Sequence, residues 1–201
     1  DLHLPADDRE FDYFCVKEAV MPFGRFPGSD VVLGPEMKST GEVMGIAGNF
    51  PAAFTKTQLA IDYEPPRGGE VFISVNDGDK RNITAIARSI ARLGFSLVAT
   101  TGTARALRAS GIECEEVGKI HAGSHTILDR IASGEIVLMI TTPFGSSTNT
   151  AGYEMRAACV RHGVSYCTTL AGAQALIAGM EAVRETGLDV IALQDLPQWE
   201  G

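Results

Sequence analysis

Apolar and polar residues alternate in two rhythms from residue 70 to the end of the chain. Short runs rich in β-branched and aromatic residues, such as EVFISV and EIVLMIT, are typical of strands, whereas apolar residues three and four positions apart are typical of helices. Gly94 follows one helical segment where a C-cap glycine belongs. The pattern predicts strands at 70–75, 95–100, 113–118, 135–141 and 164–168, and helices at 79–94, 103–111, 124–134, 149–163 and 169–187.

Strands that alternate with helices favour right-handed βαβ units and a parallel sheet. The run at 135–141 is apolar on both faces, as a central parallel strand should be. We therefore predict an α/β fold of the flavodoxin or Rossmann type, with an open parallel sheet and helices on both of its faces.

The first 60 residues have a different texture, because they are dense in Gly and Pro and show no long helical period. A short helix is predicted at 49–60, capped by Asn49, with Ala53, Phe54 and Leu59 as its apolar contacts. Two prolines and two glycines follow within 61–70, which indicates a linker and a domain boundary.

Composition narrows the class of protein. The chain has 201 residues, 45% of them hydrophobic and 21% charged, which is enough for a sizeable globular core. The net charge of −8 argues against a nucleic-acid surface, and no apolar run approaches the length of a membrane span. The four cysteines form no CxxC pair, so we expect buried, reduced thiols and a cytoplasmic location. The chain begins with Asp1 and shows no signal-peptide pattern, so a piece of a longer protein is expected.

Candidate chemistry gathers in the loops that follow the predicted strands. Ligands of open α/β sheets bind at the carboxyl ends of the strands, where helix N-termini present free N–H groups. The sequence places Lys80, the stretch 100–103, Lys119 and the stretch 141–147 in such loops. Ammonium groups, hydroxyls and glycine backbone are the chemistry of a phosphate pocket. Helix caps and turns would explain any one of these loops, but their convergence on one edge favours a ligand.

Other reactive side chains support no further site. His121 and His125 are four residues apart without a third metal ligand, which favours structural or solvated histidines. Ser146 and Ser147 have no nearby His–acid pair, so the sequence does not indicate a nucleophile.

One stretch then carries a specific resemblance. VKEAVMPFGRFPGSDVVLGPEMKSTGEVMG, residues 16–45, closely resembles the end of the second synthetase unit in large subunits of carbamoyl phosphate synthetase. The α/β part is similar to the regulatory domain of that family, which has the methylglyoxal-synthase-like fold. The resemblance implies an ATP-grasp segment at 1–62, a linker at 63–69 and an allosteric domain at 70–201.

The resemblance also implies what the parent protein does. Large subunits of this family are ligases that make carbamoyl phosphate for arginine and pyrimidine biosynthesis, with ATP, Mg²⁺ or Mn²⁺ and K⁺, beside a small glutaminase subunit and in homo-oligomers. The ATP and metal ligands of the family lie upstream of this chain. The chain alone is therefore expected to be non-catalytic and to hold no cofactor.

Regulatory domains of bacterial relatives bind UMP and IMP at one overlapping site. The resemblance carries the effector site over to Ser74, Lys80, Thr100, Gly102, Thr103, Lys119, Thr141 and Thr142. The last loop departs from the pattern, because Thr141-Thr142-Pro143 stands where some relatives have Asn-Thr-Thr. The ornithine site of some relatives is matched in part by Glu18, Tyr166 and Thr168, but Cys167 replaces an acidic residue.

Two alternatives use the same fold. A methylglyoxal synthase would need a carboxylate base, and Ser124 stands near the position where the catalytic aspartate should be. A purely structural oligomerisation domain would leave Lys80 and Lys119 unexplained, since lysines near helix N-termini are unfavourable without an anion.

Overall fold

A five-stranded parallel sheet forms the centre of the molecule in the computed structural model, which describes residues 12–21, 39–118, 126–142 and 150–196. The strands lie in the order β5-β4-β3-β6-β7, so β3, the first of them in sequence, lies at the centre of the sheet between β4 and β6. Their bounds are β3 (Glu70–Ser74), β4 (Ser96–Thr100), β5 (Glu115–Val117), β6 (Ile136–Thr141) and β7 (Ser165–Cys167). The predicted open parallel sheet is confirmed.

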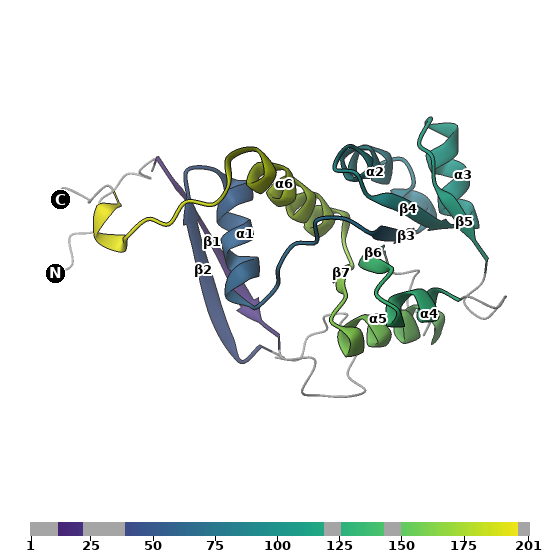
Figure 1. Ribbon diagram of the computed structural model, residues 1–201, viewed down its shortest axis with the longest axis horizontal. Coiled ribbons are helices and arrows are strands. Elements are labelled where there is room, and N and C mark those ends of the chain that lie inside the picture. The colour runs from purple at the N-terminus through teal and green to yellow at the C-terminus, as the bar shows by residue number, and fades with distance from the viewer. Residues whose placement is uncertain (1–11, 22–38, 119–125, 143–149, 197–201) are drawn as a thin grey trace.

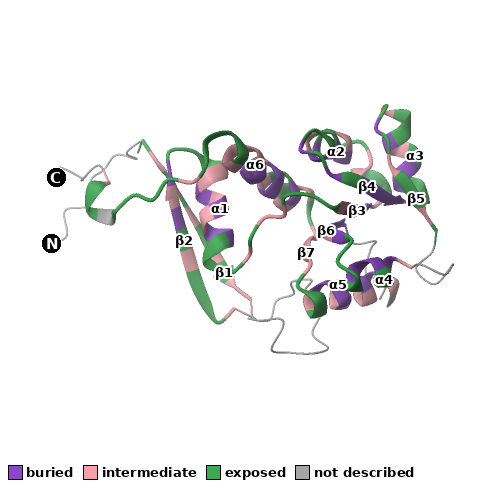
Figure 2. Ribbon diagram, viewed as in Figure 1, coloured by how far each residue is buried: buried purple, intermediate pink, exposed green. Residues whose placement is uncertain are grey.

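Helices cover both faces of this sheet (Figure 1). One face carries α2 (Ile83–Arg92), α3 (Thr101–Ala109) and α6 (Leu170–Thr186), and the other carries α4 (Ile127–Ala132) and α5 (Thr150–His162). Side chains alternate accordingly along β3: Val71 and Ile73 pack toward the first layer and Phe72 toward the second. Figure 2 shows that the buried residues follow these strands and the inner sides of the helices.

Local capping sets most element boundaries. Helix α2 begins four residues later than predicted, because Asn76 caps a 3₁₀ turn, η2 (Asp77–Asp79), before it. Gly94 has φ +89° after α2, so the predicted C-cap glycine is confirmed. Helix α4 begins after a capping box in which Thr126 and Asp129 bond to each other's backbone N–H.

The segment before the sheet forms its own small layer. An antiparallel pair, β1 (Phe14–Val20) and β2 (Gly41–Ala47), packs on α1 (Phe50–Ala60). These two strands were not predicted. The Asn49 cap of α1 is confirmed, since its side chain accepts a hydrogen bond from Ala52 N at 2.9 Å.

Helix α1 buries two of its three expected apolar contacts. Ala53 is fully buried and Phe54 packs, partly buried, against the core, whereas Leu59 is 40% exposed and its prediction is wrong. The helix also turns Thr55, Thr57 and Gln58 inward. These polar residues are tolerated because each hydroxyl and the amide find acceptors, as Thr55 Oγ1 does in Pro51 O at 2.9 Å.

The small layer of β1, β2 and α1 meets the α/β domain at a close crossing of helices α1 and α6. A Cβ at Gly179 of α6 would lie 2.3 Å from Thr55 Oγ1 of α1, so only glycine fits there. A Cβ at Gly45 of β2 would likewise lie 2.1 Å from Ala53 O. Gly45 therefore lets β2 approach the backbone of α1, and Gly179 lets α6 approach the Thr55 side chain of α1.

The described cysteines are free thiols, but they are not uniformly buried. Cys159 lies in the core, Cys114 and Cys167 are half-buried, and Cys15 on β1 is exposed, which corrects the expectation of burial for that residue. Among the described helices, none is both long and apolar enough to cross a membrane.

Candidate functional site

Three neighbouring strands end in hydroxyl residues at the same edge of the sheet. Ser74 of β3 pairs in register with Thr141 of β6, and Thr100 ends β4 on the other side. Their side chains follow Phe72, Met139 and Val98 by two positions, so all three face the layer of α4 and α5. Thr100 Oγ1 donates to Ser74 Oγ at 3.2 Å. The structure therefore brings these three predicted residues into one row.

The row lies at the first turn of α3. Thr100 is the N-cap residue of that helix, with extended backbone, and its side chain makes no capping hydrogen bond. The first N–H groups of a helix have no intrahelical partners and attract anions. Thr103 is 1% exposed and its hydroxyl accepts from Val75 N at 3.2 Å, which fixes the end of β3 against α3.

Lys80 reaches over this helix end from the turn after β3. A Cβ at Gly102 would lie 2.9 Å from Lys80 Nζ, so the ammonium group rests directly against the glycine backbone. Lys80 also forms an ion pair with Asp77, whose side chain is largely exposed. Gly102 was predicted to leave room beside its backbone for a phosphate. In the structure the Lys80 ammonium group lies in that room, so the role toward a phosphate stays a prediction.

The two threonines after β6 differ in their surroundings. Thr142 Oγ1 accepts from Asn76 N at 2.9 Å and from Asn76 Nδ2 at 3.0 Å, so it anchors the loop that leads to Lys80. Thr141 is 7% exposed, and its buried hydroxyl has no hydrogen-bond partner among the described residues. An unpaired hydroxyl is costly in a protein interior, which makes Thr141 notable beside a candidate site.

Several of the residues considered in the sequence cannot be placed. Lys119, His121, Ser124 and His125, together with the serines at 146 and 147, lie outside the described residues. Within the part of the chain that is described, no group of three or more His, Cys, Asp and Glu residues could hold a metal ion.

The second predicted set, Glu18, Tyr166 and Thr168, lines one pocket of about 630 Å³ between β1, α1 and the β7–α6 turn. Glu18 Oε2 accepts from Thr57 Oγ1 at 2.7 Å and from Gln58 Nε2. One carboxylate oxygen is therefore committed to α1. The structure brings these three residues together although Glu18 comes from β1 and the other two from β7 and the turn after it.

This pocket also contains residues that sequence reasoning missed. Burial raises the pKa of Tyr63 to about 12, with Ser165 opposing the shift, yet the phenol oxygen has no hydrogen-bond partner of ordinary geometry. Burial likewise raises the pKa of the Cys167 thiol to about 12. Both groups are neutral at physiological pH, so Glu18 supplies the negative charge among the described lining residues. A tyrosine in a proline-rich linker carries no local signal for such a position.

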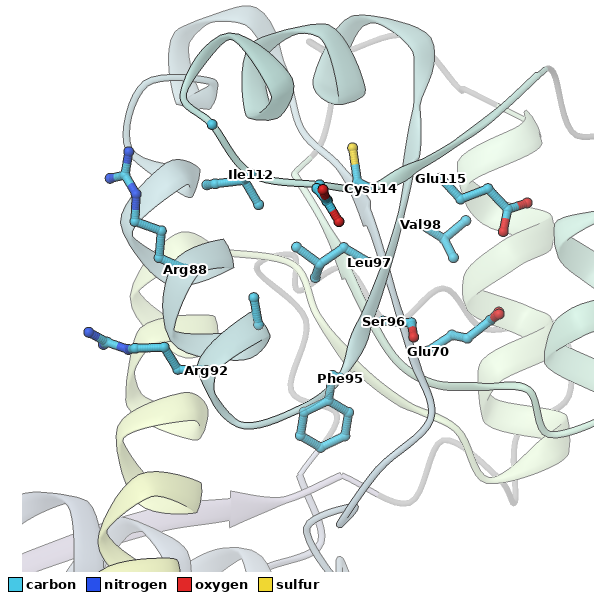
Figure 3. A pocket seen from close by; sticks show the side chains of 13 residues that line it. Glu70, Arg88, Arg92, Phe95, Ser96, Leu97, Val98, Ile112, Cys114 and Glu115 are labelled. Atoms are coloured by element: carbon cyan, nitrogen blue, oxygen red, sulfur yellow. The ribbon is translucent and has the colours of Figure 1, made fainter.

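The amino edge of the sheet holds a further pocket, of about 860 Å³ (Figure 3). Figure 3 shows Arg88 and Arg92 on one side of it and Glu70 and Glu115 on the other. None of its described lining residues belongs to the predicted site, because that site lies at the opposite ends of the strands.

Arg130 organises this amino edge and was also missed. Its side chain is 8% exposed and donates to Glu70 Oε2 at 2.9 Å and to Glu115 Oε1 at 2.7 Å. The hydrogen bonds to Glu115 and Glu70 raise the pKa of Arg130, and the pKa of Glu115 is lowered by the same partner. No local pattern could have revealed a cluster whose members are 15 and 60 residues apart.

The comparisons with known proteins agree with this architecture. Residues 82–168 match the MGS-like domain family. The chain is 49% identical over 197 residues to the carbamoyl phosphate synthase large chain, C-terminal section, of Methanopyrus kandleri, which covers 98% of this chain and 36% of that protein. It is 46% identical to the carbamoyl phosphate synthase large chain of Myxococcus xanthus, covering 94% of this chain and 18% of that protein.

A C-terminal section from Aquifex aeolicus is 40% identical and covers 98% of this chain and 38% of that protein. Among solved structures, the methylglyoxal synthase of Elizabethkingia anophelis aligns with a TM-score of 0.46 at 16% identity, covering 56% of this chain and 78% of that one.

The molecule thus contains an MGS-like domain with a parallel sheet and an anion-favouring helix end at its carboxyl edge. Over nearly its whole length, the chain belongs to the family of carbamoyl phosphate synthase large chains and matches their carboxyl-terminal section, as residues 16–45 implied. It spans 36–38% of the length of such sections and 18% of the Myxococcus large chain.

Proposed function

We propose that the chain is the regulatory end of a glutamine-hydrolysing carbamoyl phosphate synthetase large subunit, and that its strand-edge site binds nucleoside monophosphates of the UMP and IMP type. The observation that supports this most is the Lys80 ammonium held against Gly102 at the first turn of α3. A cation there is opposed by the helix dipole. A phosphate bound beside them would be attracted by both the ammonium group and the helix N–H groups.

Some residues around this position would bind the phosphate, and others would hold the loops in place. Lys80, Thr100 and the backbone at Gly102 would hold the phosphate, with Lys119 included on the resemblance alone. Ser74 would complete the hydroxyl row through its bond with Thr100. Thr103 and Thr142 would act mainly by fixing the loops, since their hydroxyls already accept backbone N–H groups.

Thr141 would face the ribose or base. Its hydroxyl is buried without a partner among the described residues, so it is available to a ligand that opens this corner of the site. Because Thr141-Thr142-Pro143 departs from the pattern of relatives, the preferred nucleotide would differ from theirs through this side of the site.

Regulation would act by coupling rather than by chemistry in this chain. The close crossing of α1 and α6 at Gly179 links the α/β domain to the segment that resembles the synthetase unit. Ligand binding that shifts α6 would therefore be felt by α1. Allosteric coupling of this kind is typically about 1–3 kcal/mol. We divide the chain into a synthetase-derived segment (1–62), a linker (63–69) and the allosteric domain (70–201).

The pocket of Glu18, Tyr166 and Thr168 is proposed as a second effector site, for an amine such as ornithine. Glu18 would attract an ammonium group, and the first turn of α6, capped by Thr169, would attract a carboxylate. Cys167 is neutral, so the two ammonium groups of such a ligand would meet one carboxylate, that of Glu18, among the described lining residues.

The parent protein is proposed to be a cytoplasmic, homo-oligomeric ligase. Upstream synthetase units of the same chain would bind ATP, Mg²⁺ or Mn²⁺ and K⁺, and a small glutaminase subunit would supply ammonia. The homology to carbamoyl phosphate synthase large chains supports this proposal.

Calorimetric titration of the chain with UMP, IMP and ornithine, each separately, tests the two sites. We expect saturable nucleotide binding that falls about tenfold or more in Lys80→Ala, because a charged hydrogen bond contributes about 1.5–3 kcal/mol. Arg81→Ala is the matched control, since Arg81 is the adjacent exposed cation. It should bind like the wild type.

Equal loss in both variants would show general charge attraction and contradict a specific phosphate site. A folded wild-type chain that binds neither nucleotide would contradict the effector proposal itself. Ornithine binding that is retained in Glu18→Gln would contradict the second site.

A further inference from the structure

A third concave region lies where α1 and α6 meet, and it shares no lining residue with the pocket of Glu18, Tyr166 and Thr168 or with the described residues of the strand-edge site. This cleft, of about 560 Å³, is walled by α1, by the proline-rich linker, by the turn between α2 and β4, and by the end of α6. Its volume falls within the usual range for small-molecule sites. It lies at the junction of the two parts of the chain, where such sites are common.

The cleft is mostly apolar. Leu59 on α1, Phe95 before β4, and Met180 and Val183 on α6 contribute its main surfaces, with Pro65 and Pro66 from the linker. The cleft also explains why Leu59 is 40% exposed although it belongs to a helix that packs on the domain. An apolar wall of this kind favours a ligand with an apolar body.

One polar group is fixed at its margin. Arg184 NH1 donates to Leu93 O at 2.6 Å, which ties the guanidinium to the turn after α2 and leaves its other N–H donors available. Arg67 lies opposite as a second, largely exposed cation, paired loosely with Glu64 at 3.7 Å. The charged lining residues are thus two arginines and one glutamate, which favours an anionic head group.

The walls are preformed. The crossing of α1 and α6 is already close and cannot tighten further, because Thr55 Oγ1 lies 2.3 Å from where a Cβ at Gly179 would stand. The bond from Arg184 to Leu93 holds the opposite corner. A site that needs little reorganisation loses less free energy on binding.

We propose that this cleft binds a small amphipathic carboxylate, with its apolar body against Leu59, Phe95 and Met180 and its carboxylate on Arg184. Such a ligand contacts both α1 and α6. It therefore stabilises the packing of the synthetase-derived segment on the α/β domain by mass action.

The test uses the 201-residue chain labelled with ¹³C at the methionine methyl groups. The probes are 4-phenylbutyrate, its neutral amide and the corresponding amine. The Met180 methyl reports the cleft, and the Met44 methyl, 58% exposed on β2, reports non-specific contact. We expect 4-phenylbutyrate to shift Met180 but not Met44, with the amide about tenfold weaker and the amine weaker still.

Two kinds of variant separate the charged contact from the apolar one. Arg184→Gln should bring the carboxylate and amide affinities within about twofold, whereas Arg92→Gln, which removes an exposed arginine outside the cleft, should keep the tenfold preference. Leu59→Trp, at a half-exposed position, should fill the cleft and abolish the Met180 shift even if Arg184→Gln does not fold. Equal affinities for carboxylate and amide in the wild type, an unmoved Met180 methyl, or an undiminished shift in Leu59→Trp would each overturn the proposal.

Discussion

The two edges of the central sheet treat their charges in opposite ways. At the amino edge, Arg130 is buried and its guanidinium is bound by Glu70 and Glu115, so the cation is committed to the fold. At the carboxyl edge, the acidic partner of Lys80 among the described residues is the exposed Asp77, and the lysine lies against a helix N-terminus that opposes it. A cluster that satisfies itself indicates structure, whereas one that leaves its cation poorly placed indicates a ligand.

Removing the central cation of the amino edge should lower stability more than any other change considered. Arg130→Met leaves the carboxylates of Glu70 and Glu115 without their cation, and also that of Glu135, which lies 3.5 Å from Arg130 Nε. Removal of one member of a buried pair costs about 3–5 kcal/mol. Because Glu115 is 57% exposed and can be solvated, we expect a smaller loss of about 2–3 kcal/mol in the free energy of unfolding. Urea denaturation measures it.

Arg105→Met on α3 is the control for this change, since Arg105 is exposed and should shift the free energy of unfolding by less than about 0.5 kcal/mol. Equal losses in the two variants would mean that the Arg130 cluster is no more important than an ordinary surface arginine.

At the carboxyl edge, the corresponding change should affect binding instead of stability. Gly102→Ala places a Cβ at 2.9 Å from Lys80 Nζ, so the lysine must move. We expect nucleotide affinity to fall about tenfold, or about 1.4 kcal/mol, while the free energy of unfolding stays level or rises, because alanine favours helix over glycine. Calorimetry and urea denaturation on the same sample separate the two effects. A drop in stability with unchanged affinity would reverse the assignment of the two edges.

This contrast also explains what could be predicted from the sequence. The parallel sheet, the two helical layers and the position of Thr100 follow from local periodicity and from the rule that parallel strands end at one edge. Ser74, which bonds to Thr100, was expected only from the family resemblance. The Arg130 cluster could not be predicted from the sequence. Its members lie on β3, β5 and α4, and only the pairing of β3 and β5 with β4 and the packing of α4 bring them together.

The small layer of β1, β2 and α1 was harder to predict for a related reason. Strand β1 carries Lys17 and Glu18 and buries none of its residues fully, and β2 fully buries only the small residues Gly45 and Ala47. Neither strand therefore shows the apolar alternation of a half-buried strand. Helix α1 buries Thr57 and Gln58 against Glu18, and polar contacts of this kind leave no hydrophobic period. Sequence patterns report burial of apolar surface and give no signal where a polar network provides the packing.

Two hydroxyls of the carboxyl edge test whether a hydrogen-bonded side chain there stabilises the fold more than one without a partner. Thr103→Val removes the acceptor of Val75 N and leaves that buried N–H unpaired, so we expect a loss of about 1–2 kcal/mol in the free energy of unfolding. Thr141→Val removes a hydroxyl that has no partner and should be neutral or stabilising by up to about 1 kcal/mol. Thermal and urea unfolding of the pair distinguish the two outcomes. Similar losses in both would show that Thr141 is satisfied in solution.

A weaker effect is a pH dependence confined to the amino edge. Arg130 lowers the pKa of Glu115 from its usual value of 4.5, chiefly through their hydrogen bond. A carboxyl with a depressed pKa in the folded state contributes stability that is complete above its unfolded pKa and is lost as pH falls through the folded value. At pH 7 the free energy of unfolding should therefore be higher for the wild type than for Glu115→Gln, by less than about 1 kcal/mol because the pair is so exposed. This difference should vanish at pH values below the lowered pKa of Glu115. Urea denaturation across this range at low salt measures it, with Glu113→Gln as the control on an exposed neighbour. A difference that persisted unchanged under acid would mean that Glu115 acts through packing, and the charge contrast between the two edges would then rest on Glu70 and Glu135.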